Sequence, residues 1–198
     1  MQSMNEIRVA GFGGQGVIMC ASVIGKAASI FEGGYSTMTQ NFGPEARGGA
    51  CSAQVIVGHE PILYPYVTNP NLLVVMSQEA YVKFASDLTP NTVMLIEQDL
   101  VRVSHIPDGV KVYGIPATRM AEEIGKRMVL NIVMVGFFGA IAGIISREAL
   151  RDAVADSVPK AFTELNLKAF DAGYEYGRKH LVEGALDLRA EAEMTVRE

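Results

Sequence analysis

The chain has 198 residues, with 17 basic and 22 acidic side chains and a formal net charge of −5. Apolar residues make up 49% of the sequence, which is enough to bury a core and excludes a disordered chain. The acidic balance, without a Lys/Arg cluster, argues against nucleic acid as the main partner, because phosphate contacts need concentrated basic charge. This length predicts one domain over residues 1–181 and a charged C-terminal extension over residues 182–198.

Short apolar runs alternate with helical patterns along the first two thirds of the chain. In chain order, the expected elements are a strand at 7–10, a helix at 17–31, extended segments at 35–40 and 51–57, a strand at 72–76, a helix at 77–86 capped by Ser77, strands at 92–97 and 111–115, and helices at 117–125, 128–146, 146–155 and 159–181. This alternation predicts a three-layer α/β/α fold with a mainly parallel sheet. The first strand–loop–helix unit is Rossmann-like and the C-terminal part is helical.

Two cysteines, Cys20 and Cys51, are too few for a disulfide framework. The chain is therefore expected to hold neither a four-cysteine iron–sulfur cluster nor a structural zinc ion on its own. Its histidines have no second ligand at metal spacing, and no serine or cysteine has a catalytic partner, so no metal-binding or catalytic residue is predicted. The first residues lack the basic and apolar regions of a signal peptide, which makes the cytoplasm the expected location.

An uncharged segment, residues 128–146, has two interpretations. It is long enough to span a bilayer, and Gly139 and Gly143 have the G-x-x-x-G spacing that favours close helix packing. A helix that is apolar all round is also typical of a buried element in an α/β core or subunit interface. The Asn131 amide and the aliphatic strands that need cover favour the buried helix, while a small membrane-anchored protein is the alternative.

A glycine-rich loop, G-F-G-G-Q-G at residues 11–16, follows the first expected strand and precedes a helix. Its glycines permit a tight turn and close approach, and free N–H groups at the helix start favour an anionic phosphate. A nicotinamide or flavin dinucleotide site is one interpretation, but the second strand ends near Gln40 and Asn41, without the acidic residue that binds the ribose. The other interpretation is that the glycines serve only tight strand-to-helix packing.

A second loop, N-F-G-P-E-A-R-G-G at residues 41–49, presents one carboxylate and one guanidinium. In a doubly wound sheet, loops after successive parallel strands meet at one edge, so this loop is expected beside the first. Arg47 would then bind a phosphate or carboxylate with two hydrogen bonds. A local surface pair between Glu45 and Arg47 is the alternative.

The chain resembles the gamma subunit of the 2-oxoacid:ferredoxin oxidoreductases. The resemblance is carried by these two loops, in this order, and by Asn131, which opens the run N-I-V-M-V-G-F-F-G-A. The resemblance covers roughly residues 5–180. It implies a subunit, inactive alone, of an enzyme that decarboxylates a 2-oxoacid on thiamine diphosphate. That enzyme passes electrons through iron–sulfur (4Fe–4S) clusters to ferredoxin and transfers the acyl group to coenzyme A.

The resemblance also implies where the cofactors and contacts lie. Thiamine diphosphate and the clusters are held mainly by alpha, beta and ferredoxin-like delta subunits. Gly13, Gly14, Gln15 and Gly16 are carried over as a loop that lines a phosphate site or the active-site cleft, and Arg47 as an anion contact. The favoured oxoacid is 2-oxoglutarate. A stand-alone nucleotide-binding module that uses only the first loop is the alternative function.

Overall fold

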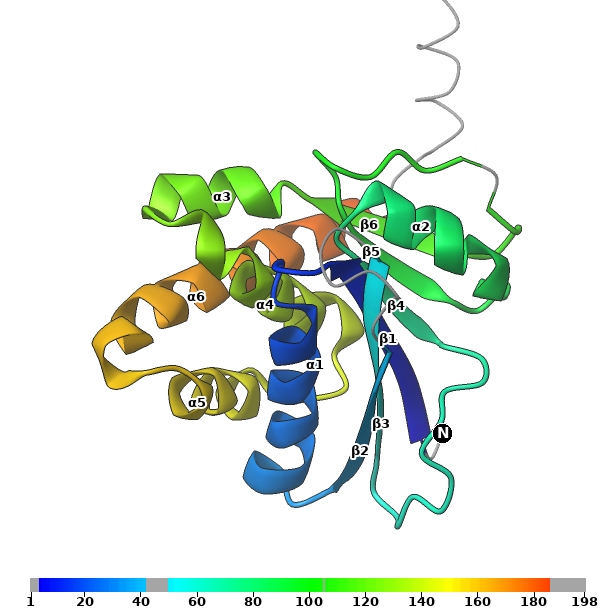
Figure 1. Ribbon diagram of the computed structural model, residues 1–198, viewed down its shortest axis with the longest axis horizontal. Coiled ribbons are helices and arrows are strands. Elements are labelled where there is room, and N and C mark those ends of the chain that lie inside the picture. The colour runs from blue at the N-terminus through cyan, green and yellow to red at the C-terminus, as the bar shows by residue number, and fades with distance from the viewer. Residues whose placement is uncertain (1–3, 42–49, 105, 186–198) are drawn as a thin grey trace, which may run out of the picture.

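The computed structural model describes residues 4–41, 50–104 and 106–185 (Figure 1). Within these residues, six strands form one sheet in the order β2-β3-β1-β4-β5-β6. The strands are β1 (Met4–Phe12), β2 (Tyr35–Asn41), β3 (Ala50–Gly58), β4 (Leu72–Val75), β5 (Val93–Glu97) and β6 (Lys111–Ile115).

Most of the sheet is parallel. β1, β4, β5 and β6 run in one direction, whereas β3 pairs antiparallel with both β1 and β2. The connection from Asn41 to Ala50 accounts for this exception, because a parallel crossover needs about a dozen residues or more. The predicted α/β fold with a mainly parallel sheet is confirmed.

Helices cover both faces of the sheet. The α-helices are α1 (Val17–Lys26), α2 (Gln78–Phe84), α3 (Ala117–Ile124), α4 (Leu130–Ala142), α5 (Arg147–Ser157) and α6 (Thr163–Glu183). A π-helix, η1 (Ala27–Phe31), extends α1, and the 3₁₀ turns are η2 (Ala85–Asp87), η3 (Arg127–Val129) and η4 (Lys160–Phe162). In Figure 1, α2 lies on one side of the sheet, and α1, α4, α5 and α6 lie on the other.

Two separate apolar cores follow from the alternation of side chains along the strands. On β4, Leu72 and Val74 belong to the core on the α1 and α4 side. Leu73 and Val75 belong to the smaller core under α2. Two of the helices, α2 and α5, start where a serine side chain caps them: the Ser77 hydroxyl accepts a hydrogen bond from the Ala80 N–H, and the Ser146 hydroxyl accepts one from the Ala149 N–H.

The uncharged segment forms α4, which is buried on almost every side. Among the described residues, no helix is both long and apolar enough to cross a membrane. The 3₁₀ turn η3 precedes α4, and Gly143 ends it in the left-handed conformation, with φ of 60°. Gly139 and Gly143 therefore do not act as one packing pair: Gly139 faces Leu150 of α5, and Gly143 is a helix cap.

The close packing of α4 involves α6 instead. A methyl group on Gly136 would lie 2.1 Å from the Phe170 carbonyl oxygen, and one on Gly173 would lie 2.0 Å from the Val133 carbonyl oxygen. Both distances are far below van der Waals contact, so the two helix backbones touch directly. Gly173 and Gly177 of α6 supply the G-x-x-x-G spacing at this contact.

We expect Gly173→Ala to lower the free energy of unfolding by about 3 kcal/mol, because the new methyl group must push two helix backbones apart. The measurement is urea denaturation followed by circular dichroism. Gly13→Ala is the matched control, because its methyl group would meet nothing within 4 Å. Equal midpoints for Gly173→Ala and the wild-type chain would contradict the direct backbone contact.

Candidate functional site

The glycine loop turns the chain from the end of β1 into α1. The Gln15 N–H donates to the Phe12 carbonyl at 3.1 Å, which closes the turn. Gly14 has φ of 103° and Gly16 has φ of 74°, both in the left-handed region that side chains rarely adopt. Glycine is therefore required at these two positions for the backbone shape.

The Gln15 side chain holds the loop against the neighbouring strand. Its Oε1 accepts from the Phe12 N–H, and its Nε2 donates to the Met76 carbonyl, both at 2.7 Å. A methyl group on Gly11 would lie 2.6 Å from Gln15 Oε1, so Gly11 makes room for this contact. Gln15 therefore joins the ends of β1 and β4 through backbone contacts.

A cavity of about 420 Å³ opens beside this loop. Its walls come from the glycine loop and α1, from the start of α4 with the turn before it, and from the start of α6 with the turn before it. The lining residues are Gly14, Gly16, Met19, Lys126, Met128, Val129, Asn131, Val158, Pro159, Phe162, Leu165 and Asn166. The lining is mostly apolar with a few polar groups, which is typical of a site for an organic ligand.

Polar groups at the cavity have fixed positions. Asn131 is buried, and its amide lies so close to Gly16 that a methyl group there would be 2.5 Å from Asn131 Nδ2. Asn166 is also buried and donates from Nδ2 to the Phe162 carbonyl at 2.8 Å. Asn131 thus sets the distance between the glycine loop and α4.

The electrostatics of the cavity favour an anion. Lys126 lies at the rim, with Nζ 4.9 Å from the centre of the Phe162 ring. The positive end of the α1 dipole faces the loop, and the first turn of α1 carries no acidic residue. Neither aspartate nor glutamate is among the lining residues. A phosphate or carboxylate would therefore meet favourable charge here.

The structure describes four of the five predicted site residues, and these four do not share one role. Gly14 and Gly16 line the cavity, while Gly13 is exposed on the same loop and Gln15 holds that loop in place. Arg47 lies outside the described residues, so its contact with an anion stays a prediction. The two strands that flank that segment meet the same edge of the sheet as the glycine loop. β2 ends there at Asn41, and β3 begins there with Ala50 opposite Phe12.

Glu32 does not supply the acidic residue that a dinucleotide site needs. Glu32, the carboxylate at about the right spacing from the glycine loop, accepts a hydrogen bond from the Ser146 N–H at 2.5 Å. It follows η1, before β2 begins, rather than standing at the carboxyl end of β2. Its carboxylate therefore caps the start of α5 instead of facing a ribose on the glycine loop.

Both cysteines are buried. Burial raises the pKa of the Cys20 thiol to about 12 and also raises the pKa of Cys51 above its ordinary value. Cys51 is buried on β3, where it pairs with Gly11 of β1. Within residues 4–41, 50–104 and 106–185, no group of three or more His, Cys, Asp or Glu side chains could hold a metal ion.

Glu97 is a buried carboxylate that sequence reasoning missed. It ends β5, and its Oε1 accepts from the Thr118 N–H in the first turn of α3 at 3.2 Å. Its Oε2 has no hydrogen-bond partner, and burial raises the pKa of the carboxyl group. The only sequence signal was its place at the carboxyl end of an apolar strand, which is where functional groups of parallel sheets lie.

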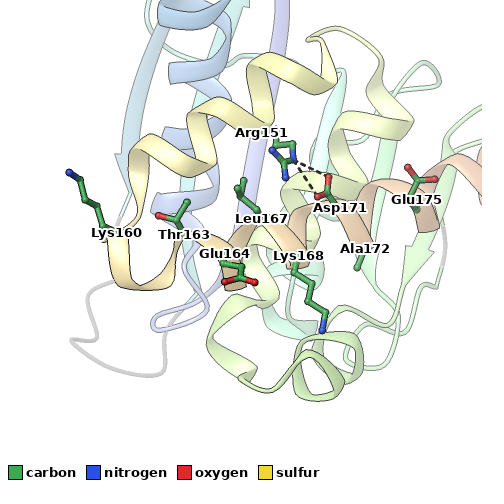
Figure 2. Close-up of a pocket in the computed structure, with 9 residues that line it drawn as sticks. All are labelled: Arg151, Lys160, Thr163, Glu164, Leu167, Lys168, Asp171, Ala172 and Glu175. Carbon is green, nitrogen blue, oxygen red and sulfur yellow. Dashed lines mark hydrogen bonds and ion pairs between the residues drawn. The ribbon is translucent and has the colours of Figure 1, made fainter.

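A second, wider groove of about 860 Å³ runs along α5 and α6 (Figure 2). Figure 2 shows charged side chains of both signs along it, with Arg151 paired to Asp171. Asp171 also pairs with Arg147 at 3.0 Å. This groove is open and its central charges neutralise each other, so the glycine-loop cavity is the stronger candidate for a ligand site.

A mainly parallel sheet with a glycine loop and an anion-favouring cavity at its carboxyl edge defines a Rossmann-like α/β domain. The chain belongs to the pyruvate ferredoxin/flavodoxin oxidoreductase family, whose model matches residues 6–176. The resemblance to the gamma subunits of 2-oxoacid:ferredoxin oxidoreductases is confirmed, and the chain is part of an oxidoreductase complex.

Three relatives show how this family uses the fold. The chain is 44% identical over 176 residues to the 2-oxoglutarate synthase subunit KorC of Methanocaldococcus jannaschii, covering 88% of this chain and 94% of that subunit. The gamma subunit of a keto/oxoacid ferredoxin oxidoreductase from Geobacter sulfurreducens PCA has 36% identity and a TM-score of 0.78, covering 89% of this chain and 99% of that one.

The third relative is a longer chain. The 2-oxoglutarate:ferredoxin oxidoreductase of Magnetococcus marinus, solved with 2-oxoglutarate, coenzyme A and succinyl-CoA bound, has 26% identity and a TM-score of 0.83. The match covers 91% of this chain but 32% of that chain. The same fold is thus a free-standing chain in one relative and part of a longer polypeptide in another.

We expect Gly13→Val to leave the free energy of unfolding within about 0.5 kcal/mol of wild type and to reduce the activity of the assembled enzyme. A side chain at Gly13 meets nothing inside the chain, so it obstructs only what approaches the loop from outside. Gly16→Ala is the contrast: its left-handed φ and the contact with Asn131 should cost about 1–2 kcal/mol or more. Full activity of Gly13→Val with normal assembly would show that the loop contacts no ligand or partner.

Proposed function

We propose that the chain is the gamma subunit of an enzyme that oxidatively decarboxylates a 2-oxoacid, preferentially 2-oxoglutarate, to its acyl-CoA. The observation that supports this proposal is the 44% identity to a 2-oxoglutarate synthase subunit over 94% of that subunit. In this reaction, the bond between the carboxylate and the carbonyl carbon breaks and releases carbon dioxide. The coenzyme A thiol forms a thioester with the acyl carbon, and the released electrons pass to ferredoxin or a related acceptor.

Other subunits hold the redox and thiamine cofactors in this proposal. An iron–sulfur cluster needs several thiolates, but this chain has two cysteines and both are buried. The residues of this chain therefore do not fit a cluster. We assign thiamine diphosphate and the clusters to alpha-, beta- and ferredoxin-like delta-type subunits, and this chain to the side of the active-site cleft that receives coenzyme A.

The cavity beside the glycine loop fits part of coenzyme A. Its Met128, Val129 and Phe162 side chains suit the aliphatic arm of the molecule. Lys126 and the start of α1 suit its phosphate groups. Arg47, outside the described residues, is proposed as a further anion contact on the basis of the resemblance alone.

The first test is the composition of the complex that forms in the native host. The tagged chain should be recovered in a brown particle several times its own mass, with thiamine diphosphate and iron bound. Kinetics of that particle with 2-oxoglutarate, pyruvate, 2-oxoisovalerate and indolepyruvate then identify the substrate by the highest kcat/KM. A colourless particle of about the mass of this chain would contradict the proposal and favour a stand-alone nucleotide-binding module.

The coenzyme A contact has its own test. In the assembled enzyme, Lys126→Ala should raise the KM for coenzyme A about fivefold with a small change in kcat, because an exposed cation near a phosphate contributes about 1 kcal/mol. Lys83→Ala is the matched control, because Lys83 is an exposed lysine on α2 and does not line this cavity. An unchanged KM for coenzyme A, or an equal rise in Lys83→Ala, would contradict the assignment of this cavity.

A further inference from the structure

Two buried carboxamide side chains lie on different walls of the cavity beside the glycine loop. Asn131 comes from the start of α4, and Asn166 comes from the start of α6. The two residues are only 3% and 7% exposed. Because both line the cavity, the small surface that they keep belongs to it.

The chain itself leaves part of each carboxamide without a partner. Within the described residues, the Asn131 side chain makes no hydrogen bond, and Asn166 uses only Nδ2, which donates to the Phe162 carbonyl at 2.8 Å. The unpaired side-chain atoms that the protein encloses completely belong to other residues. The unpaired atoms of these two asparagines therefore reach the open space of the cavity, where a ligand can meet them.

The free atoms include a donor on one wall and an acceptor on the other. Asn131 offers Nδ2, which lies beside the glycine loop at Gly16. Asn166 offers Oδ1, because its Nδ2 is already engaged. A secondary amide has one carbonyl, which needs a donor, and one N–H, which needs an acceptor. The two asparagines can supply both without any charge.

The rest of this wall is apolar. Met19, Val158, Pro159 and Leu165 line the cavity together with the two asparagines. A ligand that fits here combines amide groups with aliphatic carbon, since the hydroxyl groups of a sugar would find few partners among these side chains. Lys126, the one cation of the lining, lies apart at the rim with Phe162.

We infer that Asn131 and Asn166 bind the amide groups of the pantetheine arm of coenzyme A and make this cavity selective for that arm. The inference rests on the proposed function and adds to it the residues that recognise the ligand. Asn131 Nδ2 donates to a carbonyl of the arm, and Asn166 Oδ1 accepts from an amide N–H. The apolar side chains around them contact the carbon chain between the amides.

The test uses the assembled enzyme and three probes: coenzyme A, pantetheine, and the adenosine bisphosphate that forms the other end of coenzyme A. Asn131→Leu and Asn166→Leu keep the shape of the side chain and remove its hydrogen-bonding atoms. Each should raise the KM for coenzyme A and the dissociation constant of pantetheine about tenfold, with little change in kcat. The inhibition constant of adenosine bisphosphate should not change, whereas a merely structural role would move all three constants.

Asn91→Leu is the matched control for these variants. Asn91 lies exposed in a turn before β5 and does not line the cavity. This variant should bind every probe as the wild-type enzyme does. A rise in the KM for coenzyme A equal to that of Asn131→Leu would overturn the inference.

A modified ligand tests the same contact without changing the protein, which covers a variant that fails to fold. In an analogue of pantetheine, ester oxygens replace the amide N–H groups, so Asn166 Oδ1 has nothing to accept. The wild-type enzyme should bind this analogue about tenfold more weakly than pantetheine. Asn166→Leu should bind the two ligands equally, because its acceptor is already absent. Equal binding by the wild-type enzyme, or unchanged discrimination by Asn166→Leu, would show that the amides are recognised elsewhere.

The inference and the proposed function fail in different ways. If the enzyme forms acyl-CoA and both leucine variants keep the wild-type KM for coenzyme A, the inference is wrong and the proposed function stands. If the variants weaken adenosine bisphosphate as much as pantetheine, the asparagines do not select the arm and the inference is again wrong. If the complex binds neither coenzyme A nor pantetheine, both are wrong.

Discussion

The direct contact between the backbones of α4 and α6 determines where the walls of the candidate site lie. Gly136 and Gly173 have no side chains, so the two helices come very close together. A backbone carbonyl of each helix lies where a side chain on the glycine of the other helix would be. The start of α4 then carries Asn131 to the glycine loop, and the start of α6 carries Leu165 and Asn166 to the opposite wall. Separating these helices would widen the cavity from within, so packing and binding geometry are coupled here.

The glycine loop contributes a shape that exists before any ligand binds. Gln15 occupies its side-chain amide with backbone groups of β1 and β4, and two left-handed glycines complete the turn. Because the loop is already ordered, it loses little conformational entropy when an anion binds to it. The surrounding apolar wall and the rim lysine can then discriminate between ligands by their shape and charge.

Much of the fold was predictable because it depends on local patterns. The strand predicted at residues 111–115 matches β6, and the helix cap predicted at Ser77 forms. The direction of β3 was not predicted, because alternation of apolar residues indicates a strand but not its orientation. The packing role expected for Gly139 and Gly143 belongs to Gly136, Gly173 and Gly177, because a spacing shows which residues share a helix face but not which helix that face meets.

The candidate site was only partly predictable, for a related reason. The glycine loop is contiguous in sequence and has a recognisable pattern, so Gly14 and Gly16 were found. Lys126, Phe162 and Asn166 come from segments that meet the loop only after α4 and α6 pack. Glu97 was missed because one acidic residue at the end of a strand has no distinctive spacing, and its burial depends on α3 folding over it.

The buried position of α4 has a consequence for synthesis on the ribosome. Residues 128–146 emerge without a single charge, yet α6, which contributes the closest contact with α4, is made only afterwards. The sheet, α1 and α3 precede α4 in the chain and can pack against it as soon as it is made, but the side of α4 that faces α6 has no cover until residues 163–183 have been translated. The order of synthesis thus leaves one apolar face of α4 exposed in the nascent chain until α6 packs against it.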